Sequence, residues 1–370
     1  MVVCIDLTPI YDHLTGIERY NINISREMIK NHTENKYILI FKNEVHPLFE
    51  QISKQDNVQS IILAECNKLF FIQFRLLRAL YKIEADYYLF LSFTSPILFK
   101  KGKIVNAIHD LTCWDCPESM PSKMVNYYRF TYKFAIKNSW RIVTVSRFSQ
   151  HRICNTYRLP LEKVSVIYDG LTDIFIDEVK HENSLKQKYD LPTSYFLSLS
   201  TIEPRKNLKL LIRAYSGLLE EDIDLPDLVL AGRKGWKLEE IVPDIDTSIK
   251  EKIHFTGFVD DKDLPQIYRE ARLFVFPSKY EGFGLPLIEA MSQRVLVVTS
   301  DAASLPEVAG TACVYFKSDD VVSLKNALMQ AFNMNNIERL KRIEDGYVIS
   351  KSYSWSNEAE KLYQLLNENR

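Results

Sequence analysis

Two adjacent cations precede a predicted helix in the second half of this 370-residue chain. In the segment STIEPRKNLKLL an apolar strand ends, a loop presents Arg205 and Lys206, and a helix is predicted from about Asn207. Free N–H groups and the helix dipole attract anions at such a position. Cations there oppose the dipole unless an anion is bound, so the pattern favours a diphosphate site over a basic cap on an ordinary helix.

Two glutamates flank a glycine-containing loop in the segment FPSKYEGFGLPLIEAM. Glu281 precedes Gly282 and Gly284, and Pro286 is typical of a first helical turn, which places Glu289 about one turn into the helix. The glycines let the backbone approach a ligand closely. One carboxylate from the loop and one from the helix are suited to hydrogen-bonding pairs of hydroxyl groups on a sugar or a ribose.

A histidine ends a predicted buried strand in the first half, in the segment GKIVNAIHDLT. A lone histidine at such a place is more often a structural residue with its hydrogen bonds satisfied. The strand ends of an α/β fold face its ligand site, however, and two other candidate loops are present, so a functional role is favoured for His109.

The sequence gives little support for a metal or redox centre. Cys113 and Cys116 form the one CxxC among the six cysteines, and a structural zinc site needs four ligands, so reduced cysteines are expected. Asp260 and Asp261 follow a strand and a turn, and they are interpreted as helix-capping residues rather than metal ligands. We therefore expect neither a metal nor a cofactor.

Short apolar runs alternate with helical stretches along the whole chain. This alternation is typical of parallel sheets covered by helices. The pattern restarts after a polar connection at about Leu171–Thr193, which predicts two doubly wound domains with ligands at the carboxyl ends of the strands. The expected domains are residues 1–175 and 190–352, followed by an amphipathic helix in residues 353–370 that is expected to return to the first domain.

Charge is distributed unevenly although the net charge is only −1. Ser119–Leu161 contains eight basic residues and no acidic one, and Lys68–Lys82 combines four more cations with aromatic residues, again without an acid. Such stretches suit an anionic membrane surface, whereas solvated helix faces are the simpler explanation for either stretch alone. The near-neutral net charge argues against nucleic acid as a partner.

The N-terminus lacks the features of a signal peptide, and no apolar run is long enough to span a bilayer. A cytoplasmic protein is therefore expected, peripheral on the inner membrane face at most.

Taken together, the motifs resemble the retaining glycosyltransferases with the two-Rossmann GT-B fold, the group often called family 4. The resemblance extends along nearly the whole chain and rests on TGIERY, IHDLT, VSRFS, IEPRKN, LAGRKGW, FTGFVDDKDLPQIYREA, EGFGLPLIEAM and ASLPEVAG. The most similar members are bacterial mannosyl- and rhamnosyl-type transferases that build O-antigen or other surface polysaccharides. The family fold implies an acceptor-binding N-terminal domain and a nucleotide-sugar-binding C-terminal domain that face each other across a cleft.

The resemblance also implies roles for single residues. Arg205 and Lys206 would hold the donor diphosphate, Glu281 would hydrogen-bond the donor sugar, and His109 would contact the transferred sugar. Donor binding is further implied for Glu289 at the ribose, for the phosphate-facing Gly16, and for two short segments: Gly257, Phe258 and Val259 at the base, and Gly282, Phe283, Gly284 and Leu285. Many members have two adjacent glycines where this chain has Thr15-Gly16-Ile17.

The resemblance implies retaining, metal-independent transfer of a hexose from a nucleotide-diphosphate sugar to a glycan acceptor. The basic stretches favour a lipid-linked acceptor. Three alternatives remain open at this stage: a phosphorylase, a nucleotide-sugar epimerase and a non-catalytic donor-binding scaffold. A phosphorylase would need a pyridoxal lysine, which the sequence does not identify, and a dinucleotide-dependent enzyme would need GxGxxG after a first strand.

Overall fold

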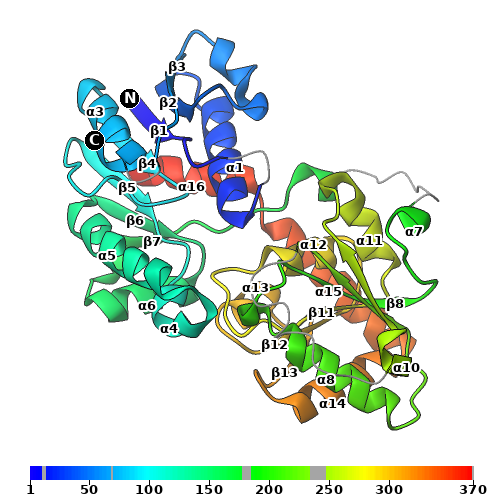
Figure 1. Cartoon of the computed structure of the whole chain (residues 1–370). Helices are drawn as coiled ribbons and strands as arrows, with labels where there is room; N and C mark the ends of the chain where they lie inside the picture. The colour runs from blue at the N-terminus through cyan, green and yellow to red at the C-terminus, as the bar shows by residue number, and fades with distance from the viewer. Residues whose placement is uncertain (11–13, 68–69, 177–184, 234–246, 369–370) are drawn as a thin grey trace. The chain divides into compact units, whose positions relative to one another are not determined.

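The computed structural model describes residues 1–10, 14–67, 70–176, 185–233 and 247–368. The chain divides into two compact units, each drawn in Figure 1. Unit 1 comprises Met1–Gly170 together with Ser354–Arg370, and unit 2 comprises Leu171–Tyr353. The C-terminal helix is therefore part of the first unit.

Unit 1 is built on a parallel sheet, which has seven strands in the described part of the chain, in the order β3-β2-β1-β4-β5-β6-β7. Its central strands are buried on both faces, as expected where crossover helices cover a parallel sheet. The strands are β1 (Val2–Asp6), β2 (Lys36–Lys42), β3 (Val58–Leu63), β4 (Tyr87–Phe90), β5 (Lys103–Ala107), β6 (Arg141–Thr144) and β7 (Val164–Val166).

Helices and short helical turns connect these strands. One of them, η3, is a π-helix, a form that the sequence pattern does not predict. The helical elements of unit 1 are α1 (Gly16–Asn31), η1 (Pro47–Phe49), η2 (Ile52–Lys54), η3 (Phe71–Leu76), α3 (Leu77–Lys82), α4 (Thr112–Asp115), η4 (Pro117–Ser119), α5 (Ser122–Asn138), α6 (Arg147–Tyr157), η5 (Leu161–Lys163) and α16 (Trp355–Asn367).

The C-terminal helix α16 packs on α1 within unit 1. The ring of Tyr363 stacks on that of His32 with centroids 3.4 Å apart, and Glu358 accepts a hydrogen bond of 2.9 Å from the backbone N–H of Tyr168. At the start of α16, the backbone of Trp355 lies so close to Gly170 that a Cβ on that glycine would overlap it. The end of the chain thus completes the first unit rather than the second.

Unit 2 repeats the architecture with a second parallel sheet, six-stranded in the residues described, in the order β10-β9-β8-β11-β12-β13. The two sheets confirm the doubly wound α/β class predicted from the alternating pattern. The strands are β8 (Tyr195–Leu199), β9 (Asp227–Ala231), β10 (Ile253–Gly257), β11 (Leu273–Phe276), β12 (Val297–Ser300) and β13 (Val314–Phe316).

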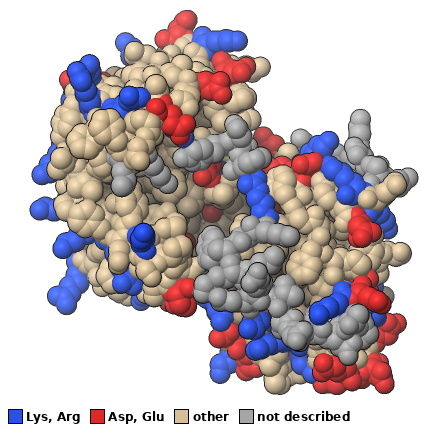
Figure 2. All heavy atoms as spheres, viewed as in Figure 1, with Lys and Arg blue, Asp and Glu red and all other residues tan. Residues whose placement is uncertain are grey.

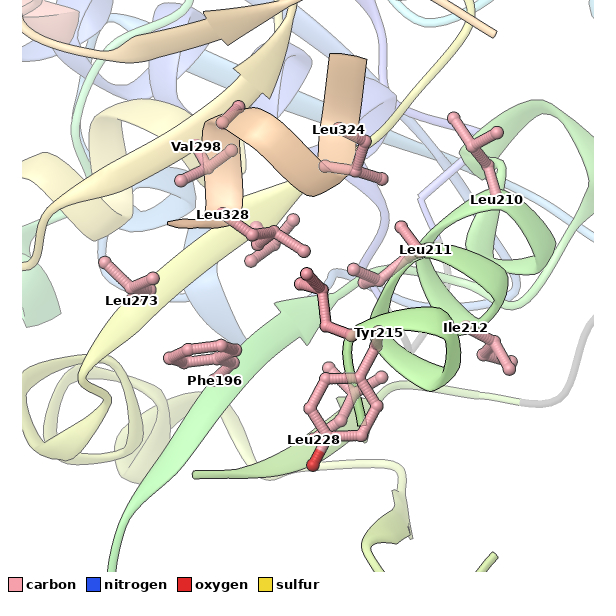
Figure 3. Close-up of a cluster of buried hydrophobic side chains, with 14 of the residues drawn as sticks. Phe196, Leu210, Leu211, Ile212, Tyr215, Leu228, Leu273, Val298, Leu324 and Leu328 are labelled. Carbon is pink, nitrogen blue, oxygen red and sulfur yellow. The ribbon is translucent and has the colours of Figure 1, made fainter. Parts of the chain in front are cut away.

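The helices α8 and α14 bury one face of this sheet. Figure 3 shows Leu211 and Tyr215 of α8 and Leu328 of α14 gathered in one cluster with Phe196, Leu228 and Leu273 of the strands. The helical elements of unit 2 are η6 (Asp173–Phe175), α7 (Leu185–Lys188), η7 (Pro204–Lys206), α8 (Leu208–Leu219), α10 (Thr247–Lys250), η8 (Asp261–Asp263), α11 (Leu264–Glu270), α12 (Leu285–Ser292), α13 (Leu305–Ala309), α14 (Val321–Phe332) and α15 (Asn336–Ser352).

Candidate functional site

The candidate site in unit 2 lies where the strand order of the sheet reverses. Strand β8 pairs with β9 on one side and with β11 on the other, so the connections that leave β8 and β11 run in opposite directions. Such a switch point, at the carboxyl ends of the strands, is the general ligand position of doubly wound sheets. Arg205 and Lys206 follow β8, and Glu281 follows β11.

A short helical turn presents the two cations. Pro204 opens the 3₁₀ turn η7, and Asn207 then takes a left-handed conformation at φ 56° before α8 begins at Leu208. Asparagine tolerates this conformation better than most residues do. The backbone N–H of Lys279 donates to the Arg205 carbonyl at 2.9 Å, which ties the two loops together. The helix start predicted at about Asn207 is confirmed to within one residue.

Arg205, Lys206 and Glu281 come together in one buried cluster. Glu281 Oε2 accepts from Arg205 Nη1 at 2.8 Å, and its Oε1 accepts from Lys206 Nζ at 2.6 Å. The other edge of the Arg205 guanidinium donates to Glu203 Oε1 through Nε at 3.1 Å and through Nη2 at 2.8 Å. The cations are therefore held at fixed positions in this structure.

The electrostatics of the cluster follow from its burial. Burial alone would raise the pKa of Glu281, but the charges of Arg205 and Lys206 outweigh it and lower that pKa to about 2. Burial also lowers the pKa of the Lys206 ammonium below its ordinary value, and the charge of Glu281 opposes that shift. The two carboxylates Glu203 and Glu281 balance the two cations, so a bound anion must compete with charges already paired.

Several polar groups on the loop after β8 retain unused hydrogen-bonding capacity. Among the described residues, the buried Oγ of Ser200 and Nδ2 of Asn207 have no hydrogen-bond partner, and the Lys206 ammonium donates to Glu281 alone. An ammonium group has three donors, so two remain for a ligand. Buried polar groups without partners are uncommon and often mark a binding site.

The loop from Gly282 to Leu285 leads from this cluster into α12. Gly284 caps the helix at φ 107°, and a Cβ there would lie 2.8 Å from Leu305 Cδ2. Phe283 is buried edge-on against Tyr353, with ring centroids 5.2 Å apart. The single hydroxyl proton of Ser304, directly before α13, is shared between the carbonyls of Glu281 at 3.0 Å and Phe283 at 2.9 Å, which ties this loop to the start of α13.

Glu289 lies inside α12, as the position of Pro286 predicts. Its buried carboxylate accepts a hydrogen bond of 3.0 Å from the hydroxyl of Tyr268, a residue of α11. This hydrogen bond connects Glu289 to α11, whereas Glu281 is connected to the two cations. Unit 2 thus provides two carboxylates with different surroundings, one paired with cations and one hydrogen-bonded to a neutral hydroxyl.

The predicted base-binding segment lies at the end of β10. Gly257 has φ 70° with open space where a Cβ would stand, and its carbonyl accepts from the backbone N–H of Gly232 at 2.8 Å. Val259 is buried, whereas the ring of Phe258 is half exposed beneath the guanidinium of Arg233, 4.4 Å from the ring centroid. A flat Arg–Phe surface therefore borders this segment.

His109 and Gly16 belong to unit 1. His109 follows β5, and its Nε2 lies 2.9 Å from the Leu91 carbonyl. A carbonyl oxygen only accepts, so Nε2 carries the proton and Nδ1 is left as an acceptor. Burial lowers the pKa of His109, and this hydrogen bond opposes that shift.

Gly16 is the first residue of α1 and follows the N-cap residue Thr15. The backbone N–H of Thr15 donates to Glu18 at 2.8 Å. Residues 11–13, which precede this segment, lie outside the described residues.

Asp260 stands at the N-cap position of η8, as interpreted from the sequence, but its side chain makes no cap hydrogen bond. Its carboxylate accepts from Lys188 Nζ at 2.6 Å, as does the carboxylate of Asp263. The lysine and the two carboxylates carry opposite charges, so both hydrogen bonds are charge-assisted. None of the six cysteines forms a disulfide, and among the described residues no group of three or more histidine, cysteine, aspartate or glutamate side chains is placed to hold a metal.

Four residues around the site are not predicted from the sequence: Glu203, Arg233, Tyr268 and Ser304. Glu203 and Ser304 stand inside the quoted motifs IEPRKN and ASLPEVAG, and Arg233 stands inside LAGRKGW. Their roles depend on contacts between segments that are distant in the sequence. Motif membership is thus the available signal, and it does not specify the partner.

Comparison with known proteins places this geometry in context. A family model described as glycosyl transferases group 1 matches residues 180–368. The chain is 33% identical over 258 residues to the O-antigen chain mannosyltransferase B of Escherichia coli, covering 69% of this chain and 68% of that protein. It is also 33% identical over 243 residues to the serotype-specific mannosyltransferase WbdA of Escherichia coli, which covers 64% of this chain but 29% of that longer protein.

A solved structure shares the fold over the full length. The crystal structure of a glycosyltransferase from Rickettsia africae superposes with a TM-score of 0.71 at 15% sequence identity, covering 100% of this chain and 99% of that one. This likeness confirms the fold class expected from the sequence, the pair of Rossmann-like parallel-sheet domains termed GT-B.

Proposed function

Because this chain belongs to the glycosyl transferases group 1 family and is thus a glycosyltransferase, we propose that it transfers a hexose from a nucleotide-diphosphate sugar to a glycan. Mannose is the favoured hexose, since the relatives with 33% identity are named as mannosyltransferases of O-antigen synthesis. The glycan would then be a surface polysaccharide such as an O-antigen chain.

The buried cluster of Arg205, Lys206 and Glu281 carries this proposal. A departing nucleotide diphosphate gains negative charge, and fixed cations stabilise that charge without reorganising. Lys206 has spare donors for a phosphate oxygen, and Glu281 is held 2.6 Å from its ammonium. A diphosphate bound by the cations would place the attached sugar beside Glu281, which can accept hydrogen bonds from sugar hydroxyls.

The remaining parts of the donor molecule can be matched to residues in the same way. Glu289 would bind the ribose hydroxyls, the loop from Gly282 to Leu285 would contact the donor, and the base would lie against Gly257–Val259, where the Arg233–Phe258 surface offers stacking. From unit 1, Gly16 would face the phosphates and the Nδ1 acceptor of His109 would contact the transferred sugar. No cofactor and no metal enters this scheme.

We further propose front-face transfer with retention of the anomeric configuration. The bond between the anomeric carbon and the phosphate oxygen breaks, and that oxygen takes the proton of the acceptor hydroxyl as the new glycosidic bond forms on the same face. The cations of the cluster would then act in place of a divalent metal at the leaving group.

A lipid-linked acceptor at the inner membrane face is favoured by the surface of unit 1. Helix α5 has exposed Lys123, Phe130, Lys133 and Lys137 at a spacing that places them on one face, and it contains no acidic residue. Figure 2 shows Lys and Arg side chains along the edge of unit 1 where Figure 1 draws α5 and α6. Cations beside an exposed aromatic ring suit an anionic lipid surface. No helix among the described residues is long and apolar enough to cross a bilayer.

The proposed activity is tested by incubating the purified protein with GDP-mannose, UDP-glucose, UDP-galactose and dTDP-rhamnose, each with a lipid-linked glycan acceptor. We expect one donor to release its nucleotide diphosphate in the presence of EDTA and to give a product with the donor's anomeric configuration by NMR. An inverted product would contradict the front-face mechanism, and loss of activity with EDTA would contradict metal independence. No release from any donor would contradict the transferase proposal.

A further inference from the structure

The carboxylate of Glu289 is held by a residue of the neighbouring helix. Helices α11 and α12 pack on each other in unit 2 (Figure 1), and the hydroxyl of Tyr268 on α11 donates to Glu289 Oε2 on α12 at 3.0 Å. Both side chains are buried, with 0% of Tyr268 and 7% of Glu289 exposed. A hydrogen bond that is shielded from water in this way is stronger than one at the surface, so it fixes the orientation of the carboxylate.

The ring of Tyr268 is itself held by two other aromatic rings. It lies edge-on to Phe274 of β11, with centroids 5.1 Å apart, and edge-on to Phe175 of η6, with centroids 6.0 Å apart. Edge-to-face aromatic pairs at these distances are favourable. The position of the Tyr268 hydroxyl is therefore set by packing on its ring, and this packing does not depend on the hydroxyl.

The two helices are joined a second time, one turn after Glu289. The guanidinium of Arg269 on α11 donates to Oε1 of Gln293, the C-cap residue of α12, at 2.8 Å. Gln293 Nε2 in turn donates to the Phe175 carbonyl at 3.0 Å. These bonds involve neither the Tyr268 hydroxyl nor the Glu289 carboxylate. Helices α11 and α12 should therefore stay together when the Tyr268 hydroxyl is removed.

A carboxylate held in this way is suited to recognise a pair of adjacent hydroxyl groups. A carboxylate can accept about four hydrogen bonds, so the bond from Tyr268 leaves capacity for the 2′- and 3′-hydroxyls of a ribose. Binding groups discriminate best when their own rotamers are locked by packing and hydrogen bonds. A site built to hydrogen-bond a hydroxyl strongly rejects an analogue that lacks it, because a buried polar group then stays unpaired. Tyr268 thus affects which pentose the site accepts.

We propose that Tyr268 is a positioning residue, which aligns Glu289 with the ribose hydroxyls and makes the donor site select a ribonucleoside diphosphate over its 2′-deoxy counterpart. The inference rests on the proposed function, in which Glu289 binds the ribose. It favours GDP- and UDP-linked sugars as donors over dTDP-linked sugars, because the pentose of dTDP has no 2′-hydroxyl.

The experiment measures dissociation constants of GDP, UDP, their 2′-deoxy counterparts and dTDP for the purified full chain by isothermal titration calorimetry. Tyr268→Phe removes the hydroxyl and keeps the ring that packs on Phe175 and Phe274. Tyr195→Phe is the matched control. Tyr195 is also 0% exposed, and its hydroxyl donates at 2.8 Å to the carbonyl of Ile267 on the same helix α11, rather than to Glu289.

We expect the wild type and Tyr195→Phe to bind GDP or UDP about tenfold or more tightly than its 2′-deoxy counterpart, as expected for a hydrogen bond to a charged group. In Tyr268→Phe this ratio should fall severalfold through weaker binding of the ribonucleotide. Unchanged affinity for the 2′-deoxy nucleotide would show that the variant is folded. A ratio in Tyr268→Phe equal to that of the wild type would overturn the proposal, as would an equal fall in Tyr195→Phe.

Glu289→Gln tests whether Tyr268 acts through Glu289. This variant should itself discriminate less, and adding Tyr268→Phe to it should lower the ratio no further, since the two residues form one interacting pair. A further fall in the double variant would overturn the positioning role.

Two results for the wild type separate this inference from the proposed function. Binding of GDP or UDP without discrimination against the 2′-deoxy form, or tighter binding of dTDP than of either, would overturn the inference alone. Binding of none of these nucleotides would overturn the donor site itself, and the inference with it.

Discussion

Glu281 is the residue on which the charge balance of the candidate site depends. Its folded pKa of about 2 lies below the ordinary value of 4.5. A depressed carboxyl pKa stabilises the folded state fully above the unfolded pKa, and the contribution is lost as the pH falls through 4.5 toward 2. The pairing of this one carboxylate with two cations therefore predicts a defined dependence of stability on pH.

We predict that Glu281→Gln destabilises the protein by about 3 kcal/mol at pH 7, because it leaves two buried cations with less compensation. Urea unfolding at pH 7, 5 and 3.5 would measure this. The difference from wild type should be the same at pH 7 and pH 5 and smaller at pH 3.5. Glu338→Gln breaks an exposed pair with Arg342 and should cost less than about 0.5 kcal/mol. Equal stabilities of Glu281→Gln and wild type at pH 7 would contradict the prediction.

The surroundings of His109 predict its tautomer and its charge. The hydrogen bond to the Leu91 carbonyl requires a proton on Nε2, and burial lowers the pKa below the ordinary 6.5. The ring should therefore be neutral at pH 6.5, and its contribution to stability should be complete above that pH and be lost below it. Ring ¹⁵N chemical shifts would measure both properties. A ring protonated on both nitrogens at pH 6.5, or on Nδ1 alone, would be inconsistent with the structure.

At the scale of elements, the alternation of strands and helices is what the sequence predicts best. Helix α11 lies between β10 and β11, as the alternation predicts. Local periodicity suffices for a helix such as α14, because its buried residues Leu324, Ala327, Leu328 and Ala331 form a single apolar stripe. The partner of Asp260 and the π-helix η3 are not predictable in this way, because both depend on contacts with other segments rather than on local pattern.

The residues that make up the site can be predicted from the sequence, but which of them contact each other cannot. Arg205 and Glu281 are each identified from their own loop. They meet only because β8 and β11 are neighbours, and strand order is not encoded in local periodicity.

Gly232, directly after β9, lies against Ser200 at the start of the loop that follows β8. A substitution at this glycine therefore tests how that loop is held. Gly232 has φ 133°, and a Cβ there would overlap the carbonyl oxygen of Ser200. Gly232→Ala must displace the loop that leads to Arg205, and we expect a loss of about 4 kcal/mol in the free energy of unfolding. Chemical denaturation would measure it.

Gly257→Ala is the matched control for that substitution. Gly257 also has a positive φ, 70°, but open space surrounds the position of a Cβ. Only the backbone conformation is unfavourable there, so a loss of about 1 kcal/mol is expected. Similar losses in the two variants would show that the contact with Ser200 is not the cause.

At the scale of the whole molecule, each unit has its own parallel sheet, and the strand order reverses at β1 in unit 1 and at β8 in unit 2. In unit 2 the reversal lies beside the paired cations Arg205 and Lys206.

The surface of α5 predicts salt-dependent membrane association of the whole protein. The purified chain should sediment with vesicles that contain anionic lipid at low salt and be released at high salt, because screening weakens the attraction. Phe130→Ser combined with Lys133→Ser and Lys137→Ser should reduce sedimentation at least severalfold. Lys341→Ser removes an exposed charge from α15 in unit 2 and should have no effect. Absence of binding by the wild type at low salt would contradict the membrane proposal.

The most direct test of the donor site is thermal unfolding of the purified protein with GDP, UDP and dTDP, each alone and as its common sugar conjugates. A ligand at about 100 times its dissociation constant should stabilise the fold by about 2.7 kcal/mol, which is readily detected as a rise in Tm. We predict that one nucleotide series raises the Tm of the wild type and of Lys209→Ala, an exposed cation on α8, but not that of the Arg205→Ala, Lys206→Ala double variant. An equal rise in the double variant, or no rise with any nucleotide in the wild type, would contradict a diphosphate site at Arg205 and Lys206.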